Sequence, residues 1–221
     1  MSEIAMTGAE ALVKTLEDCG VEQCFTNPGT SEMHAVAAIG RAEKLRASLC
    51  LFEGVATGAA DGYARMALKP ACTLLHLGPG LANGLANLHN ARRARSPIVN
   101  IVGDHAVSHR TLDAPLASDL AGFAKPVSKW IKSADTADAV GEAAAEAVAV
   151  AQEAAAGVAT LILPADTAWS PSKGPAAPVA VRPAPAPDEG AVAAAKAALA
   201  FGDRSALLLS DPVLMEEGLD L

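Results

Sequence analysis

Short apolar runs alternate with longer helical patterns along most of the chain, and this alternation is what most restricts the possible folds. Strands are expected at residues 21–26, 48–52, 72–77, 97–102, 127–131 and 159–163, the fifth at a sheet edge, and helices at about 7–20, 31–39, 53–67, 81–93 and 135–155. Most of the runs are apolar throughout, which is typical of strands covered by helices on both faces. The sequence therefore predicts an α/β fold, a doubly wound and mostly parallel sheet flanked by helices.

The chain is long enough for one domain and part of another, with 221 residues. Prolines recur between Ser170 and Pro187 without a helical pattern, which indicates an extended linker. We expect a first domain over 1–168, a linker over 169–187 and the start of a second α/β domain over 188–221. That start would hold a helix at 188–200 and a strand at 205–210, too little to bury a core.

Charge and composition exclude several classes of protein. Lys and Arg number 17 against 25 Asp and Glu, a net charge of −8, which argues against a nucleic-acid binder or a polybasic membrane anchor. No apolar run approaches the roughly 20 residues of a membrane-spanning helix, and the N-terminus does not read as a secretory signal. The four cysteines, Cys19, Cys24, Cys50 and Cys72, form no CxxC pair, so we expect reduced thiols, mostly buried, and a cytoplasmic protein without membrane contact.

Candidate site residues follow the predicted strands, because ligands of an open parallel sheet bind beyond the carboxyl ends of its strands. Glu53 directly follows an apolar run and opens a helix rich in Gly and Ala. Burial would favour its protonated form, whereas the helix N-terminus would favour the charged form. Two interpretations are open: an acid that caps the helix, or a functional carboxyl with room for a ligand beside it.

The turn expected at residues 78–80 permits a second interpretation of the chain. Gly78 and Gly80 lie between a strand and a helix, as in a dinucleotide-binding fingerprint, and Asp104 ends the following strand where a ribose-binding acid would stand. Asn83 occupies the position of the third glycine, however, and the unit lies in the middle of the domain instead of its first turn.

Histidines give two further candidates. His76 ends an apolar strand and is either a core residue or part of a site. His105 and His109, with Asp104 and Asp113 nearby, have a spacing that superficially resembles metal ligands. Because that segment contains a proline and is not helical, the spacing does not place the two imidazoles on one face, and no metal site is predicted.

Four segments, taken in order, resemble the N-terminal pyrimidine-binding domain of the thiamine-diphosphate-dependent 2-keto-acid enzymes, such as acetolactate synthase and benzoylformate decarboxylase. They are residues 20–32 (GVEQCFTNPGTSE), 52–65 (FEGVATGAADGYAR), 78–83 (GPGLAN) and 96–104 (SPIVNIVGD). The likeness covers about residues 7–168, and the ordered series is far more specific than any one motif. It places Asp104 at the end of a strand and gives it no ribose to bind.

The resemblance implies thiamine diphosphate as cofactor and decarboxylation of a 2-keto acid, after which the carbanion is protonated or joined to a second carbonyl. Glu53 would hydrogen-bond the aminopyrimidine ring nitrogen and so favour loss of the cofactor's C2 proton. His76 and Thr30 would contact the substrate and transfer protons. The positions that would line the pyrimidine are Asn27, Pro28, Gly29 and Asn83.

The resemblance also implies that these residues form only half of a site. The domain that binds diphosphate and Mg²⁺ in the family, with its Gly-Asp-Gly motif, is absent from this sequence, and FAD, present in some acetolactate synthases, would sit largely outside it. We therefore expect a homodimer or tetramer, or a complementing C-terminal half, and an isolated chain that binds the cofactor weakly and decarboxylates nothing. An NAD-type dinucleotide domain and a non-catalytic binding remnant remain as alternatives.

Overall fold

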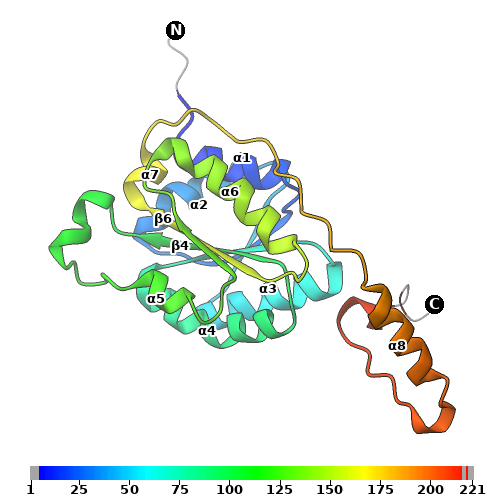
Figure 1. The fold of residues 1–221 in the computed structure, drawn as a ribbon. Coiled ribbons are helices and arrows are strands. Elements are labelled where there is room, and N and C mark those ends of the chain that lie inside the picture. The colour runs from blue at the N-terminus through cyan, green and yellow to red at the C-terminus, as the bar shows by residue number, and fades with distance from the viewer. Residues whose placement is uncertain (1–4, 216–217, 219–221) are drawn as a thin grey trace. The chain divides into compact units, whose positions relative to one another are not determined.

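The computed structural model describes residues 5–215 and residue 218. The chain divides into two compact units between Arg182 and Pro183. In the first unit, six parallel strands form one sheet in the order β2-β1-β3-β4-β6-β5 (Figure 1). The strands are β1 (Gln23–Asn27), β2 (Arg46–Leu49), β3 (Ala71–Leu75), β4 (Ile98–Asp104), β5 (Trp130–Ser133) and β6 (Val158–Pro164).

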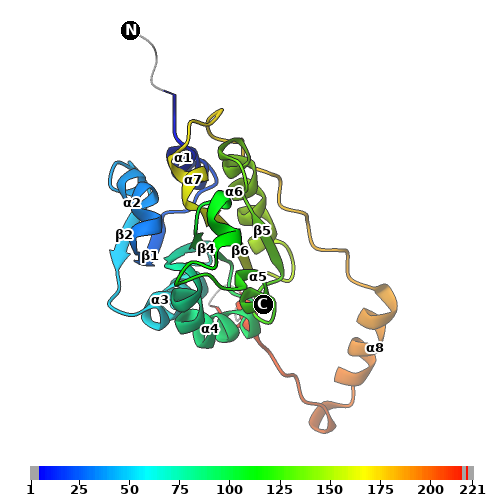
Figure 2. The same ribbon diagram turned by 90° about the vertical axis from the view of Figure 1, so that its left-hand side faces the viewer.

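Helices cover both faces of this sheet, as Figures 1 and 2 show. One face carries α1 (Gly8–Asp18), α2 (Met33–Ile39), α6 (Ala137–Gln152) and α7 (Ala165–Trp169). The other carries α3 (Glu53–Ala67), α4 (Leu77–Arg93) and α5 (Leu120–Ala124). The predicted doubly wound α/β class is confirmed.

The apolar strands serve two hydrophobic cores at once. Successive side chains of a strand point to opposite faces, so Cys72 and Leu74 of β3 pack on the α1 and α6 side while Ala71 and Leu75 pack on the α3 and α4 side. Every residue of β3 and β6 is buried. This double coverage explains why these strands lack a polar–apolar alternation.

Both edge strands are displaced from the positions that the sequence predicted. The strand expected at 127–131 does lie at an edge, beside β6, but β5 spans Trp130–Ser133 and so begins three residues later. The strand expected at 48–52 is wrong in position, since β2 ends at Leu49 and all four of its residues are exposed. The apolar run continues past the ladder with β1, so Leu51 and Phe52 lie exposed before α3.

The start of α4 also differs from the prediction. Residues 78–80, expected as a turn, belong to the first turn of the helix, and His76 is its N-cap residue instead of a strand residue. The chain reverses at Leu77, whose φ is +53°. Pro79 fits here because the first helical turn has no intrahelical use for its N–H groups.

In the first unit, three short helices lie where none was expected. The segment after β4, predicted as a loop, contains the 3-10 helix Val107–Leu112, and α5 follows it. Helix α7 begins immediately after Pro164, the residue expected to end β6. Such short helices are fixed by tertiary contacts more than by periodicity, which is why the sequence pattern missed them.

The proline-rich segment is extended, and its first part is bound to the first unit. Ser170 accepts a hydrogen bond from the Gly8 N–H (3.0 Å), Ser172 donates to Met6 (2.8 Å), and the Ala176 N–H donates to Thr15 Oγ1 (3.0 Å). The domain boundaries at 168 and 187 stay predictions.

In the second unit, the predicted helix is present as α8 (Glu189–Leu199), capped by Asp188, which accepts from the Ala191 N–H. The strand expected at 205–210 is wrong: these residues form no strand. A strand needs neighbours to satisfy its backbone, and none of the described residues beyond 182 provides one. Residues 216–217 and 219–221 of the expected second domain lie outside the described residues.

The cysteine prediction agrees with the structure. Cys24, Cys50 and Cys72 are buried, Cys19 is partly buried, and all four are free thiols. Burial raises the pKa of the Cys19 and Cys50 thiols. Within the described ranges, no helix combines the length and the hydropathy needed to cross a membrane.

Candidate functional site

The candidate residues gather at the carboxyl edge of the sheet between β1 and β3. Here β1 has neighbours on both sides that follow it in the chain, β2 and β3, and the connections after β1 and β3 run to opposite faces. Such a switch point leaves a crevice between the loops. The turn at 27–30 follows β1, His76 follows β3, and Glu53 starts the helix after β2.

Glu53 points across to α4 and does not cap its own helix. Phe52 is the N-cap residue of α3, and Glu53 is the first residue of the helix. Its Oε2 accepts a hydrogen bond from Nδ2 of Asn83 (2.9 Å), while Oε1 has no hydrogen-bond partner among the described residues. The capping interpretation is therefore wrong, and one oxygen of a half-buried carboxylate is open to a ligand.

Close packing of α3 on α4 fixes the distance between Glu53 and Asn83. The Thr57 hydroxyl donates to the carbonyl of Gly84 (3.1 Å), and Nδ2 of Asn87 donates to the carbonyl of Gly54 (2.7 Å). A Cβ on Gly84 would come within 2.9 Å of Thr57 Cγ2, so only glycine permits this approach. The small residues noted in the sequence thus hold the two helix starts together.

Two glycines connect Glu53 to His76 and to the turn after β1. A Cβ on Gly80 would lie 3.2 Å from Glu53 Oε1 and 3.5 Å from His76 Cβ. A Cβ on Gly29 would overlap the His76 ring. Glu53, His76 and the turn after β1 therefore lie next to one another, and the absence of side chains at Gly29 and Gly80 leaves the space between them.

His76 contacts a carboxyl to which the sequence assigned no role. Its Nδ1 lies 2.8 Å from Oε2 of Glu32, a residue of the short 3-10 helix Thr30–Glu32 that is fully buried. The same Oε2 accepts the Gly29 N–H at 2.7 Å. Burial raises the pKa of Glu32, opposed by these two contacts, which lower it. An acid three residues after a glycine turn was the available signal, but it did not reveal the burial.

The other predicted site residues are placed as follows. Asn27 donates from Nδ2 to the carbonyl of Cys50 (2.7 Å), so it ties the end of β1 to the residue after β2. Pro28 lies beside it in the turn, and Thr30 is exposed at the start of the 3-10 helix. The structure thus joins Gly29 with His76 and Glu53 with Asn83 by contact, with Gly80 between the two pairs. It places Asn27, Pro28 and Thr30 in the same turn as Gly29.

The residues that suggested a dinucleotide-binding domain make other contacts in the structure. A Cβ on Gly78 would overlap the Ser118 side chain, so this glycine admits a protein side chain in place of a phosphate. Asp104 accepts from Nε of Arg110 (3.0 Å) and from the N–H of His105 (2.8 Å). Both Asp104 and Arg110 line a separate cavity of about 330 Å³ after β4.

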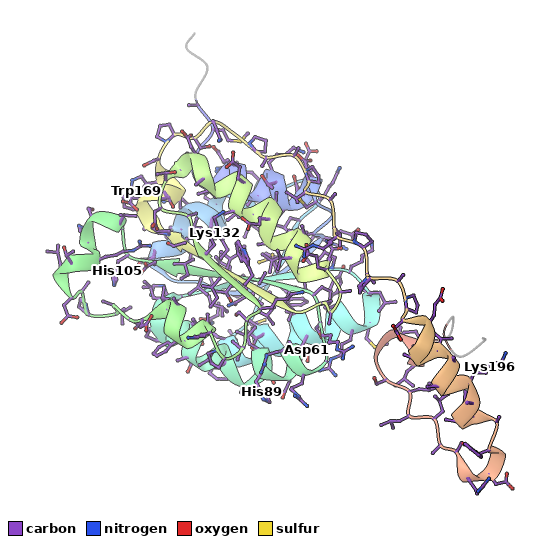
Figure 3. All side chains as sticks on the ribbon, viewed as in Figure 1. Asp61, His89, His105, Lys132, Trp169 and Lys196 are labelled. Carbon is purple, nitrogen blue, oxygen red and sulfur yellow. The ribbon has the colours of Figure 1, made fainter. Side chains whose placement is uncertain are left out.

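The candidate metal spacing is not supported by proximity. His105 lies on the segment after β4 (Figure 3), with Nε2 buried, while His109 is exposed on the 3-10 helix that follows. In the part of the chain that the structure describes, no group of three or more His, Cys, Asp or Glu side chains is arranged to hold a metal ion.

The arrangement offers three chemical capabilities at one edge of the sheet. A carboxylate with one free oxygen can hold a proton at a ring nitrogen, an amide beside it can orient that ring, and an imidazole backed by a buried carboxyl can move a proton. Exposed apolar side chains at Leu51, Phe52 and Val55 lie close in sequence to Glu53.

Comparison with known proteins finds a family model and relatives that match this chain. The family model for the N-terminal TPP binding domain of thiamine pyrophosphate enzymes matches residues 6–123. Among curated relatives, the "Putative acetolactate synthase large subunit IlvX" of Mycobacterium tuberculosis (strain H37Rv) is 58% identical over 189 residues, 85% of this chain and 36% of that protein. Benzoylformate decarboxylase of Pseudomonas aeruginosa is 35% identical over 133 residues, 60% of this chain and 25% of that enzyme.

A solved structure agrees with the fold. The "putative thiamin diphosphate-dependent enzyme isolated from Mycobacterium smegmatis" superimposes with a TM-score of 0.80 at 30% identity, over 90% of this chain and 38% of that one. The chain spans about a third of the length of such proteins.

Proposed function

Since the chain belongs to the thiamine pyrophosphate enzymes and carries their N-terminal TPP binding domain, we propose that it supplies the pyrimidine-binding side of a thiamine diphosphate site, with Glu53 as the acid that holds a proton at the ring nitrogen. The free Oε1 of Glu53 beside Asn83 and Gly80 carries this proposal. Oε2 of Glu53 accepts the hydrogen bond from Asn83, so the carboxyl is oriented before a ligand arrives.

The residues present fit the aminopyrimidine half of the cofactor. The space beside Oε1 exists because Gly80 has no side chain, and the turn of Asn27, Pro28 and Gly29 lies on the far side of His76. Thiamine diphosphate supplies a carbon nucleophile that adds to a keto group and takes up the electron pair released with carbon dioxide. Glu53 acts earlier, by sharing its proton with the ring.

His76 and Thr30 take the substrate side of the same crevice. The imidazole is partly exposed, with 23% of its side chain accessible, and it is braced by Glu32 and packed on Gly29. A group so fixed can protonate or deprotonate a bound 2-keto acid or its product. Thr30, exposed at the end of the turn, offers a hydroxyl for a substrate contact.

We propose a decarboxylation of a 2-keto acid, followed by protonation or by addition to a second carbonyl. The names of the acetolactate synthase and benzoylformate decarboxylase relatives support this reaction class. The diphosphate and Mg²⁺ would be bound by residues outside these 221, in a longer form of the protein, a second subunit or a complementing half. On its own the chain would bind the cofactor weakly and would not turn over a substrate. We place it in the cytoplasm, without membrane or nucleic-acid partners.

Amide chemical shifts of the isotope-labelled chain test the assignment of the pyrimidine site. Titration with thiamine diphosphate should shift the signals of Gly29, Glu53, Gly80 and Asn83, with a Kd on the order of 1 mM. Glu53→Gln should weaken binding at least several-fold. Glu142→Gln, an exposed acid on α6, should leave binding unchanged.

Two outcomes would contradict the proposal. One is a shift pattern centred on Asp104 and Arg110, whether the ligand is thiamine diphosphate or NAD. The other is an affinity for thiamine diphosphate that Glu53→Gln does not alter.

A further inference from the structure

Glu32 is a buried carboxyl that the proposed chemistry at Glu53 does not use. It is fully inaccessible to solvent, although it belongs to a three-residue 3-10 helix on the loop after β1. Burying an acid is costly unless specific contacts compensate for the lost water. The contacts of Glu32 therefore indicate what the residue does.

All of the polar contacts of Glu32 are made by one oxygen. Oε2 accepts the N–H of Gly29 at 2.7 Å and lies 2.8 Å from Nδ1 of His76. Oε1 is buried and has no hydrogen-bond partner among the described residues. The carboxyl is thus arranged around a single interaction with the imidazole, and the Gly29 N–H keeps Oε2 in place for it.

Two glycines make room for this pair from opposite sides. A Cβ on Gly103, at the end of β4, would overlap the Glu32 carboxyl at Oε1. A Cβ on Gly29 would overlap the imidazole ring of His76. The backbone at Gly103 therefore lies directly against Glu32, and the backbone at Gly29 lies directly against the imidazole.

The pairing decides which ring nitrogen carries the proton. Oε2 already accepts the Gly29 N–H, and as an ionised oxygen it accepts a second hydrogen bond from Nδ1–H. Neutral imidazole has one N–H, so the other nitrogen, Nε2, is then left with a lone pair. Nε2 has no hydrogen-bond partner among the described residues, and the ring is partly exposed.

We propose that Glu32 is a positioning residue for His76: its carboxylate keeps the proton of the neutral imidazole on Nδ1 and presents the Nε2 lone pair to a bound ligand. In this state Nε2 accepts a proton from the ligand and later returns it, while the Nδ1 proton stays on the ring and the carboxylate stabilises the imidazolium in between. The proposal deepens the function above and rests on it only for what His76 does to the substrate.

The tautomer of His76 can be measured on the chain itself, without cofactor. Ring ¹⁵N shifts recorded at about pH 8, above the usual titration range of imidazole, should show Nδ1 protonated in the wild type. In Glu32→Leu no acceptor remains beside Nδ1, so the proton should move to Nε2, the nitrogen that mainly carries it in free neutral histidine. Asp61→Asn is the matched control, because Asp61 is another buried acid (Figure 3), bonded to Arg65 and Ser96; it should leave the tautomer unchanged.

The proposal is overturned if the wild-type ring carries its proton on Nε2, a result that needs no variant to fold. It is also overturned if Glu32→Leu leaves the proton on Nδ1. Should Glu32→Leu fail to fold, Glu32→Asp and Glu32→Ala provide the same comparison, since the first draws the carboxylate away from Nδ1 and the second removes it. Retention of the Nδ1 proton in both would contradict the proposal.

Kinetics separate this proposal from the function on which it rests. In an enzyme assembled from this chain and a diphosphate-binding domain, Glu32→Leu should lower kcat on the order of 10²-fold with a smaller change in KM. It should have no further effect in a His76→Ala background, because a positioning residue acts through its partner. Additive losses would contradict the positioning role. If His76→Ala alone kept full activity, the substrate role of His76 would fail, while the tautomer result would still decide the role of Glu32.

Discussion

At the scale of single residues, the site depends on glycines that leave space for other side chains. Gly80 is in the first turn of α4, and a Cβ there would come within 3.2 Å of Glu53 Oε1, so that the carboxyl would have to shift by a few tenths of an ångström. The same Cβ would occupy the space that we assign to the pyrimidine ring. Stability and binding should therefore respond in different directions.

We expect Gly80→Ala to leave the free energy of unfolding unchanged or raise it by up to about 1 kcal/mol, because alanine favours the helix, while thiamine diphosphate binding falls at least tenfold. Urea unfolding and calorimetric titration measure the two effects. Gly62→Ala, in α3 with open space around the added Cβ, is the control that should gain a similar stability and keep binding. Unchanged binding in Gly80→Ala would show that the ring lies elsewhere.

The sequence predicted part of this residue-scale picture. Glu53 and His76 were recognisable from their positions after apolar runs, and Asn83 from the family resemblance. The bond between Glu53 and Asn83 could not be read from the sequence, because it depends on how closely α3 approaches α4. Glu32 was missed since an acid after a turn normally faces solvent, and only the space at Gly103 reveals that this one is buried.

At the scale of elements, helix α1 begins with a reciprocal capping box. The Glu10 N–H donates to Thr7 Oγ1 (3.3 Å), and Glu10 Oε2 accepts the Thr7 N–H (2.8 Å). The Thr7 N–H is the main cause that lowers the pKa of Glu10. A lowered pKa in the folded state means that the ionised carboxylate stabilises the fold.

We therefore expect Glu10→Gln to lower the free energy of unfolding by about 1 kcal/mol at pH 7. The contribution of Glu10 is present above its unfolded pKa near 4.5 and is lost as pH falls through the lower folded pKa. The difference between the two proteins should thus shrink below pH 4.5. Urea unfolding at pH 7 and pH 4 checks this, and an equal difference at both would contradict the assignment of the effect to charge.

The order of strands and helices could be predicted from the sequence, but several boundaries could not. The uniform apolar runs identified β3, β4 and β6, which are covered on both faces. The run at 48–52 misled, because β2 is an exposed edge strand whose bounds are set by pairing with β1. The start of α4 was missed because Gly78 and Pro79 usually break helices, whereas in a first turn they are tolerated.

At the scale of the whole chain, the two hydrophobic cores lie within the first unit. Both are built from residues between Ala9 and Ala168. Among the described residues of the second unit, none with a described side chain is buried. Folding free energy comes mainly from apolar burial, so the first unit should not depend on the second.

A chain that ends at Arg182 should therefore fold with a urea midpoint indistinguishable from that of the 221-residue chain. Residues 183–221 alone should be unfolded by circular dichroism, because a single exposed helix is marginal in water. A large loss of stability on truncation would show that the second unit contributes to the core.

The role proposed for Glu53 is tested most directly by the rate at which the C2 hydrogen of thiamine diphosphate exchanges with deuterium. It should be measured in an enzyme assembled from this chain and a diphosphate- and magnesium-binding domain. We expect the exchange rate to be well above that of free cofactor. The rate should fall on the order of 10²-fold or more in Glu53→Gln and stay unchanged in Glu142→Gln. Exchange at the wild-type rate in Glu53→Gln would contradict the role proposed for Glu53.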